Sequence, residues 1–220
     1  MLTTELLNNN IPRLQLKDSI AKALQLINDF KVTHLAVVGD QIFVGLISEE
    51  DLLDAEDDKQ PIQFLEKHFL NASVKENEHF LNAVHCSNRF DTSVVPVLNE
   101  AKELVGVITA VDLLKALGDF AGVNELGGII VMEMERNQFA ISEISRIVES
   151  NEATILHLNT TVQPATGLIT VTIHLNKKEI ATIVAAFERY EYDVIYFFGD
   201  EKFENEIHSN YRHLMNYLDI

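Results

Sequence analysis

The stretch VGLISEEDLL at residues 44–53 recurs as VGVITAVDLL at residues 105–114. A glycine, a hydroxyl residue and an aspartate keep their places in both copies at a constant offset of 61: Gly45 and Gly106, Ser48 and Thr109, Asp51 and Asp112. A repeat of this length indicates one supersecondary unit that is used twice, because a single copy cannot bury its own apolar face. The sequence therefore predicts a cleft between two similar halves.

The offset between the two copies changes along the repeat. Upstream of the repeated stretch, Ala23 matches Ala83 and Phe30 matches Phe90 at an offset of 60. One additional residue in the second copy reconciles the two offsets, and we expect this insertion in the turn at 99–103.

Each copy is expected to fold in the order helix, strand, strand, helix. Apolar residues at helical spacing and short apolar runs bounded by turn residues indicate these elements. The helices are expected at 18–30 and 49–55 in the first copy and at 78–90 and 110–117 in the second. The strands are expected at 34–38 and 42–47, then at 93–98 and 104–108, with strand-like lead segments at 12–16 and 71–74.

The charge of the chain restricts its partners. The net charge is −17, and the chain is acidic both before and after residue 118. A surface of this sign repels nucleic-acid phosphates and anionic lipid headgroups. We therefore expect neither a nucleic acid nor a membrane surface as a partner.

Length and composition indicate a folded protein of the cytoplasm. The chain has 220 residues, of which 47% are hydrophobic, enough for one large domain or two small ones. The first ten residues, MLTTELLNNN, lack the features of a secretory signal, and no stretch approaches the length of a membrane span. A lone cysteine, Cys86, excludes a disulfide framework and a cysteine-based zinc site.

The hydroxyl and acidic residues of the repeat have two interpretations. Ser48 and Asp51, like Thr109 and Asp112, stand three residues apart, which is the form of a helix capping box. Capping alone would explain both residue types. The same groups also suit a ligand, since a carboxylate accepts hydrogen bonds from two sugar hydroxyls and helix-terminal amides attract an anion.

The paired G-x-[I/V]-[S/T]-x-x-D motifs resemble those of the CBS domain, in which two such units form a Bateman module. The resemblance covers about residues 1–118, with repeat one at about 1–58 and repeat two at about 59–118. It implies an adenosine-containing ligand such as AMP, ADP, ATP or S-adenosylmethionine. The residues that would contact this ligand follow from the motif: Asp51 and Asp112 on the ribose hydroxyls, Ser48 and Thr109 beside the phosphate.

The second site resembles the family more closely than the first. The strand before the second motif contains Pro96, as family members usually do, whereas the first copy has Ala36 there. Seven of the ten residues at 49–58 are acidic, and Glu49 and Glu50 directly follow Ser48. These charges oppose the attraction of a helix start for phosphate, so we expect phosphate at the second site. The acidic run itself is expected to be a solvated helix end.

After residue 118 the pattern changes to strand, helix, strand, strand, helix, strand. These elements are expected at 129–135, 138–150, 153–162, 168–176, 177–190 and 194–198, and their order is that of the ferredoxin-like fold. Placed after a CBS pair, residues 127–200 resemble the ACT domain, an amino-acid-sensing module. The fold class is therefore α+β, with a CBS pair followed by a ferredoxin-like, ACT-like domain.

The ACT-like part departs from its family at the ligand loop. An ACT domain typically has an acidic residue and Pro-Gly after its first strand, whereas this chain reads ERNQF at 135–139. Without the glycine a ligand approaches the backbone less easily, so dimerisation is favoured over amino-acid sensing.

Apolar residues at spacings of three and four predict a C-terminal amphipathic helix at 201–220. The whole arrangement resembles the bacterial acetoin-utilisation accessory proteins.

One histidine pair, His157 and His174, has the spacing of a possible metal site. Pairing Leu156 with Leu175 across the hairpin places His157 opposite His174, within reach of one metal ion. An exposed polar face is the favoured interpretation of this pair, so we expect no metal.

The chain contains no catalytic motif such as G-x-x-x-x-G-K-[S/T], G-x-S-x-G or H-E-x-x-H. The leading hypothesis is a cytoplasmic, non-enzymatic regulator that binds an adenosine-containing ligand, uses no cofactor and acts as a homodimer on an unknown client protein. The alternatives are a ligand-free CBS/ACT dimerisation and interaction module, and an amino-acid sensor that acts through the ACT-like domain.

Overall fold

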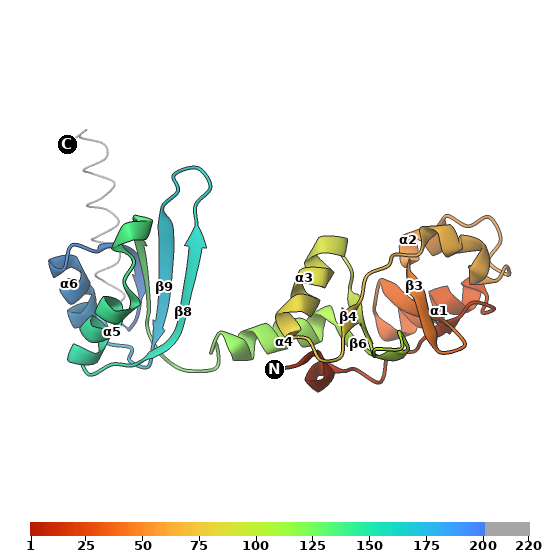
Figure 1. Cartoon of the computed structure of the whole chain (residues 1–220), viewed down its shortest axis with the longest axis horizontal. Helices are drawn as coiled ribbons and strands as arrows, with labels where there is room; N and C mark the ends of the chain where they lie inside the picture. Colours follow the sequence, from red (N-terminus) through yellow and green to blue (C-terminus); the bar gives the residue numbers. More distant parts are fainter. Residues whose placement is uncertain (201–220) are drawn as a thin grey trace. The chain divides into compact units, whose positions relative to one another are not determined.

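The structure is a computed structural model that describes residues 1–200 (Figure 1). The helix predicted at 201–220 lies outside the described residues. The chain divides into two compact units, Met1–Leu117 and Gly118–Ile220, and each is described by itself. The predicted α+β class is confirmed.

The first unit consists of two copies of one three-stranded sheet with its helices. Repeat one contains β1 (Leu14–Gln15), α1 (Ile20–Phe30), β2 (His34–Gly39), β3 (Ile42–Ser48) and α2 (Glu49–Leu53). Repeat two contains β4 (Val74–Lys75), α3 (Phe80–Phe90), β5 (Val94–Leu98), β6 (Leu104–Thr109) and α4 (Ala110–Phe120). The sheet orders β1-β2-β3 and β4-β5-β6 confirm the predicted hairpins.

The predicted insertion lies in the second hairpin turn. In repeat one, Gly39 pairs with Ile42 across two residues with positive φ, Asp40 at 49° and Gln41 at 74°. That backbone twist is typical of a tight hairpin. In repeat two, five residues separate the paired Leu98 and Leu104, whereas four separate the equivalent pair of repeat one, Val38 and Phe43, so repeat two has one additional residue in this turn.

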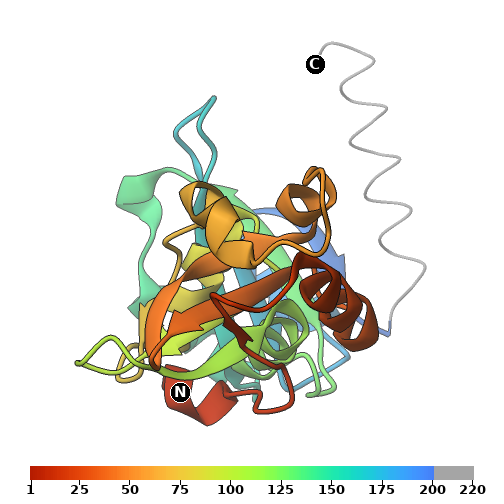
Figure 2. The ribbon, with the colours of Figure 1, turned by 90° about the vertical axis from the view of Figure 1, so that its right-hand side faces the viewer.

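Two 3-10 segments that the sequence did not predict join the repeats: η1 (Thr3–Leu6) and η2 (Ile62–His68). The residues after η1 lie on repeat two, where the Asn8 amide donates to the Val107 carbonyl at 2.7 Å. The residues after η2 lie on repeat one, where Leu46 and Leu70 exchange two backbone hydrogen bonds of 2.9 Å. Each repeat is therefore completed by a segment that precedes the other, as the dark red N-terminal turn beside repeat two shows in Figures 1 and 2.

The first unit has one apolar core that both repeats fill. Leu35, Val37 and Ile47 of repeat one are fully buried in the same cluster as Val95 and Ile108 of repeat two. This shared core agrees with the expectation that neither copy buries its apolar face alone.

Both motif glycines lie under one of these two segments, which are called the crossing segments below: residues 69–70 pass over Gly45, and residues 7–9 pass over Gly106. A Cβ atom at Gly45 would lie 2.6 Å from Cβ of Phe69 and 3.3 Å from the Leu70 carbonyl oxygen. A Cβ atom at Gly106 would lie 3.1 Å from Cδ2 of Leu7, the end of a flexible side chain. At Gly45 a side chain would therefore overlap the backbone segment that passes over the strand, whereas at Gly106 it would meet only side chains that can move.

The second unit has the predicted βαββαβ order. It contains β7 (Ile129–Met134), α5 (Ile141–Ser150), β8 (Ile155–Val162), β9 (Ile169–Leu175), α6 (Ala181–Arg189) and β10 (Asp193–Phe198). All strand pairs are antiparallel in the order β10-β7-β9-β8, which is the ferredoxin-like topology. Alternate residues of β9 are buried in one cluster with Ile144 of α5 and Phe187 of α6, so both helices cover one face.

Both helices of the second unit begin later than predicted. The segment before α5 forms a separate 3-10 turn, η3 (Arg136–Gln138), whose capping box joins Glu135 and Gln138. The segment before α6 is held by two backbone bonds, from Gly128 to the Lys177 carbonyl and from Asp200 to the Lys178 carbonyl. Because the Lys177 and Lys178 carbonyls accept hydrogen bonds from Gly128 and Asp200, they do not accept bonds within the helix, and α6 begins only at Ala181.

One predicted pair in the β8–β9 hairpin is wrong. Leu175 pairs with Ile155, not with Leu156, because the register shifts between Ile155 and His157. Beyond this irregularity the predicted register is confirmed, and His157 lies opposite His174.

We predict that Gly45→Ala destabilises the protein by about 2 kcal/mol, because the new methyl group overlaps the backbone segment that carries Phe69. Gly106→Ala should lose less than about 1 kcal/mol, since the Leu7 side chain can move away and alanine restricts the unfolded chain. Urea unfolding followed by circular dichroism measures both. Equal losses in the two variants would contradict the role assigned to the crossing segment.

Candidate functional site

The second motif forms a closed hydrogen-bond network at the start of α4. The Thr109 hydroxyl donates to Oδ2 of Asp112 at 2.6 Å and accepts from the Asp112 amide at 3.1 Å. The Thr109 amide also donates to Oδ2, at 3.3 Å, which completes a capping box. Asn8 of the crossing segment donates to the same oxygen at 3.0 Å. Oδ1 of Asp112 accepts no hydrogen bond from residues 1–200, which leaves it available to another donor.

The first motif repeats this arrangement with a different outer partner. The Ser48 hydroxyl donates to Oδ2 of Asp51 and accepts from the Asp51 amide at 3.1 Å. Oδ1 of Asp51 lies 3.4 Å from Nδ1 of His68, at the end of η2. The predicted capping role of both motifs is thus confirmed, and each aspartate also contacts the segment that crosses its own repeat.

The strand pairing places both motifs beside the starts of β2 and β5, where the two repeats meet. This region, which contains residues 33–34 and 93–94 and the two motifs, is called the seam below. His34 lies beside Ser48 in one ladder, and Val94 lies beside Thr109 in the other. The residues before these strands join the repeats directly, since the Thr33 amide donates to the Ser93 hydroxyl at 2.9 Å. The two motifs therefore lie at equivalent places along a shared seam.

Sequence reasoning missed the seam residues Thr33, His34 and Ser93. The offset of 60 does relate Thr33 to Ser93, and both carry a hydroxyl group at the start of an inner strand. Their carbonyls accept hydrogen bonds from Glu49 and Ala110, the first residues of α2 and α4. A polar residue repeated immediately before an apolar strand was the signal that could have identified them.

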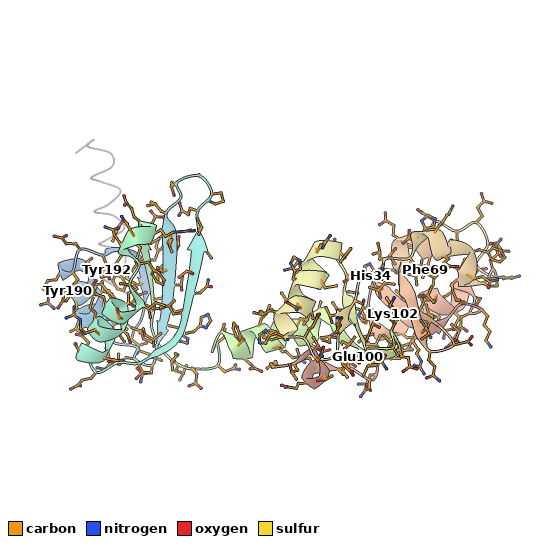
Figure 3. All side chains as sticks on the ribbon, viewed as in Figure 1. His34, Phe69, Glu100, Lys102, Tyr190 and Tyr192 are labelled. Carbon is orange, nitrogen blue, oxygen red and sulfur yellow. The ribbon has the colours of Figure 1, made fainter. Side chains whose placement is uncertain are left out.

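His34 is the buried titratable group of this seam (Figure 3). Its side chain is 8% exposed, and Nδ1 lies 2.9 Å from the Thr33 hydroxyl. Burial lowers the pKa of His34, which the carboxylates of Asp91 and Asp51 offset only in part. The imidazole is therefore neutral at pH 7.

Electrostatics distinguish the two motif sites. Burial raises the pKa of Asp112, but hydrogen bonds from Thr109 and Asn8 and the charge of Lys115 outweigh this effect, so the pKa lies below its ordinary value. Asp112 is therefore ionised at pH 7.

The helices that follow the two motifs differ in length: α4 has 11 residues, whereas α2 has five. A longer helix aligns more peptide dipoles, which favours an anion at the start of α4.

Pro96 lies inside the second sheet. It is buried in β5 opposite Val107, whose carbonyl accepts the Asn8 amide. Pro96 therefore lies beside the part of β6 to which the crossing segment binds through Asn8.

Two of the hollows that residues 1–117 form are not lined by the motif hydroxyls or carboxylates. The larger, of about 800 Å³, lies between β3, the segment at 71–78 and the second hairpin turn. The smaller, of about 260 Å³, lies between β6 and residues 8–13. Asn8 joins the smaller hollow to the second motif, because it also donates to Asp112.

The predicted histidine pair of the second unit lies against an aromatic ring. The ring of His157 is 5.9 Å from that of Phe120, in an edge-to-face arrangement. Within residues 1–200 no group of three or more His, Cys, Asp or Glu residues could hold a metal ion. His157 and His174 therefore lack a third ligand of these types in the described part of the chain.

The second unit also has a buried tyrosine, Tyr192, near the exposed Tyr190, and Figure 3 labels both. Tyr192 donates to Oε2 of Glu143 at 3.1 Å, and Arg146 lies over the ring of Tyr190 at 5.4 Å. Burial, together with the charge of Glu143, raises the pKa of Tyr192 to about 12. The phenol is thus protonated at neutral pH and ties α5 to the residues after α6.

The described residues include no helix that is long and apolar enough to cross a bilayer. At the amino-acid level, residues 4–58 and 71–119 match the family model of the CBS domain. The two matches coincide with the two structural repeats.

Solved structures similar to this chain also contain CBS domains. A CBS domain pair/ACT domain protein from Thermotoga maritima is 19% identical and has a TM-score of 0.49, over 55% of this chain and 98% of that one. The CBS domains of a transcriptional regulator from Streptococcus pneumoniae are 19% identical, with a TM-score of 0.46 over 52% and 98% of the two chains. A Methanocaldococcus jannaschii protein described as a candidate archaeal homologue of γ-AMPK is 24% identical, with a TM-score of 0.48 over 57% and 52%.

We predict that the protein loses stability as the pH falls from 7 to 5, in part through His34. Because the folded state lowers the pKa of this imidazole, the unfolded chain binds the proton first, near the ordinary pKa of about 6.5. His34→Gln should therefore reduce the slope of unfolding free energy against pH, by at most about 1.4 kcal/mol per pH unit. His85→Gln, on the exposed face of α3, is the control. An unchanged slope in the His34 variant would contradict the prediction.

Proposed function

Because the chain carries a tandem pair of CBS domains, we propose that it is a non-enzymatic regulator that binds an adenosine-containing ligand at the seam between the repeats. The ligand classes are AMP, ADP, ATP and S-adenosylmethionine. The protein would work in the cytoplasm as a homodimer and transmit ligand binding to a client protein.

One observation carries this proposal: both repeats present a carboxylate and a hydroxyl at equivalent places on the seam. Asp112 is ionised, and its Oδ1 is open to a donor among the described residues. A carboxylate oxygen in this state can accept a hydrogen bond from a ribose hydroxyl. The amides at the start of α4 and the Thr109 hydroxyl lie beside it, where an anionic group is favoured.

The second site suits a phosphorylated ligand better than the first. Glu49 and Glu50 follow Ser48, whereas Ala110 and Val111 follow Thr109. Each glutamate opposes a phosphate by about 1 kcal/mol at an effective dielectric near 20 with salt screening. Together they would weaken phosphate binding at the first site by more than about tenfold.

The second candidate function is a CBS pair without ligand that serves dimerisation and interaction. Its support is the structural use of the motif aspartates, since Asp112 holds Asn8 and Asp51 lies beside His68. The amino-acid sensor is less favoured, because the capping box of Glu135 and Gln138 already uses the amides where an ACT ligand would approach.

Exposed apolar side chains support self-association. Val111 and Leu114 on α4 are 61% and 70% exposed, and Tyr196 and Phe198 on β10 are 61% and 57% exposed. Covering apolar surface favours association, and a two-fold dimer is the commonest closed arrangement.

We predict that Asp112→Ala removes most AMP affinity in isothermal titration calorimetry, while Asp51→Ala changes it little. Asp112→Asn provides a second variant that keeps a hydrogen-bonding side chain at the helix start, and thermal melting separates ligand loss from unfolding. If the ligand-free alternative holds, AMP neither binds nor raises the melting temperature of the native protein.

Replacing Glu49 and Glu50 with glutamine should strengthen phosphate binding at the first site and leave the second unchanged. Neutral adenosine should bind less tightly than AMP, because it lacks the charge that the helix start attracts. Selection of the site by charge is contradicted if Asp51→Ala lowers AMP affinity more than Asp112→Ala does, or if adenosine binds as tightly as AMP. In either case the shape of the site, and not its charge, decides where the ligand binds.

We predict a homodimer at micromolar concentration in light scattering, with apolar surface of both units covered. Leu114→Ser on α4 should shift the protein toward a monomer by reducing that apolar contact. Phe64→Ser, at a side chain that is 62% exposed on η2, is the control for a general loss of apolar surface. A monomeric native protein would contradict this proposal without affecting the proposed ligand.

A further inference from the structure

The larger hollow lies at the hairpin end of the first unit, away from the repeated motif along β3. Phe43 and Val44, at the start of that strand, line it, whereas the motif residue Ser48 ends the strand. Glu100 and Lys102 of the second hairpin turn, labelled in Figure 3, also line it. Its volume of about 800 Å³ lies in the range of small-molecule sites. The hollow is therefore separate from the seam site proposed above.

The turn that lines this hollow is held in one conformation. The Asn99 side chain donates to Oε2 of Glu103 at 2.7 Å and accepts from the Glu103 amide at 2.9 Å. Repeat one also fixes this turn of repeat two, because the Phe43 amide donates a hydrogen bond to the Lys102 carbonyl at 3.0 Å. The inserted residue of repeat two thus belongs to an ordered wall that is shared between the repeats, which preorganises the site.

The hollow contains charges of both signs that are not paired with one another. Lys75 and Lys102 carry ammonium groups, and Glu76, Glu78 and Glu100 carry carboxylates. Among residues 1–200 no salt bridge joins any of these five side chains. A ligand with a single charge would meet both favourable and unfavourable groups, whereas a molecule with both charges can pair with both kinds.

We propose that this hollow binds a zwitterion, specifically an α-amino acid with an apolar side chain. The carboxylate of the ligand pairs with Lys75 and Lys102, and its ammonium group pairs with Glu76 and Glu100. The ligand's side chain lies against Phe43, Val44 and Leu98, the apolar part of the lining. This inference does not depend on the adenosine site.

The smaller hollow provides a natural comparison. It occupies the related place on β6, where Val105 corresponds to Val44, and it contains one cation, Arg13, but no acidic residue. It therefore lacks a partner for an ammonium group. Binding of a zwitterion should distinguish the two hollows by charge as well as by size.

The test is calorimetric titration of the full chain with L-leucine, N-acetyl-L-leucine and L-leucinamide. L-Leucine should bind, and the two analogues should bind at least about tenfold more weakly, because each lacks one of the two charges. Lys102→Gln and Glu100→Gln, both on the surface turn, should each weaken L-leucine binding by at least about fivefold. Arg13→Gln is the matched control and should leave it unchanged.

AMP titration distinguishes this site from the seam. The Lys102 and Glu100 variants should bind AMP as the native protein does, whatever that affinity is, and Asp112→Ala should keep its L-leucine affinity. The proposal is overturned if L-leucine does not bind, if leucinamide binds equally well, or if the Lys102 and Glu100 variants bind L-leucine as the native protein does.

Discussion

The first unit depends on two backbone segments that each cross the opposite repeat. In each three-stranded sheet the last strand, β3 or β6, is an outer strand with an open edge, and an open edge must be covered or paired. Leu70 covers β3 through Leu46, and Asn8 covers β6 through Val107. The crossing is close enough that only glycine fits beneath it at Gly45. This contact explains the glycine of the first copy; at Gly106 the crossing segment approaches through the Leu7 side chain.

The same segments reach the residues that would bind a ligand. Asn8 donates to Asp112 on repeat two, and His68 lies beside Asp51 on repeat one. The aspartate that caps a helix therefore also anchors the segment that closes the sheet. A ligand that contacts Asp112 would act on a group that joins the N-terminal segment to repeat two. Binding energy at this position can thus be coupled to the packing of the two repeats, which is what a regulatory module requires.

The repeated stretch was sufficient to predict the hairpins, the inserted residue and the capping pairs, because these depend on local spacing and on the internal match. The βαββαβ order of the second unit followed for the same reason. The late start of α6 depends on backbone hydrogen bonds to distant residues, such as Gly128 to Lys177, whereas α5 starts late because of the capping box of Glu135 and Gln138, and the register error at Leu156 arises from a shift between Ile155 and His157. The seam residues and the two hollows arise where segments far apart in sequence meet, and no local pattern specifies that contact.

The two copies differ in the charges around the helix that follows the motif. Carboxylates at the end of a helix oppose its dipole, and α2 is followed directly by the acidic run that begins at Asp54. Helix α4, with Lys115 in its middle and no such run, continues for 11 residues. Glu49 and Glu50 add direct repulsion at the start of α2, where an anion could otherwise be attracted. These charges add to the different partners of the two aspartates, Asn8 and His68, while the fold of the two repeats stays alike.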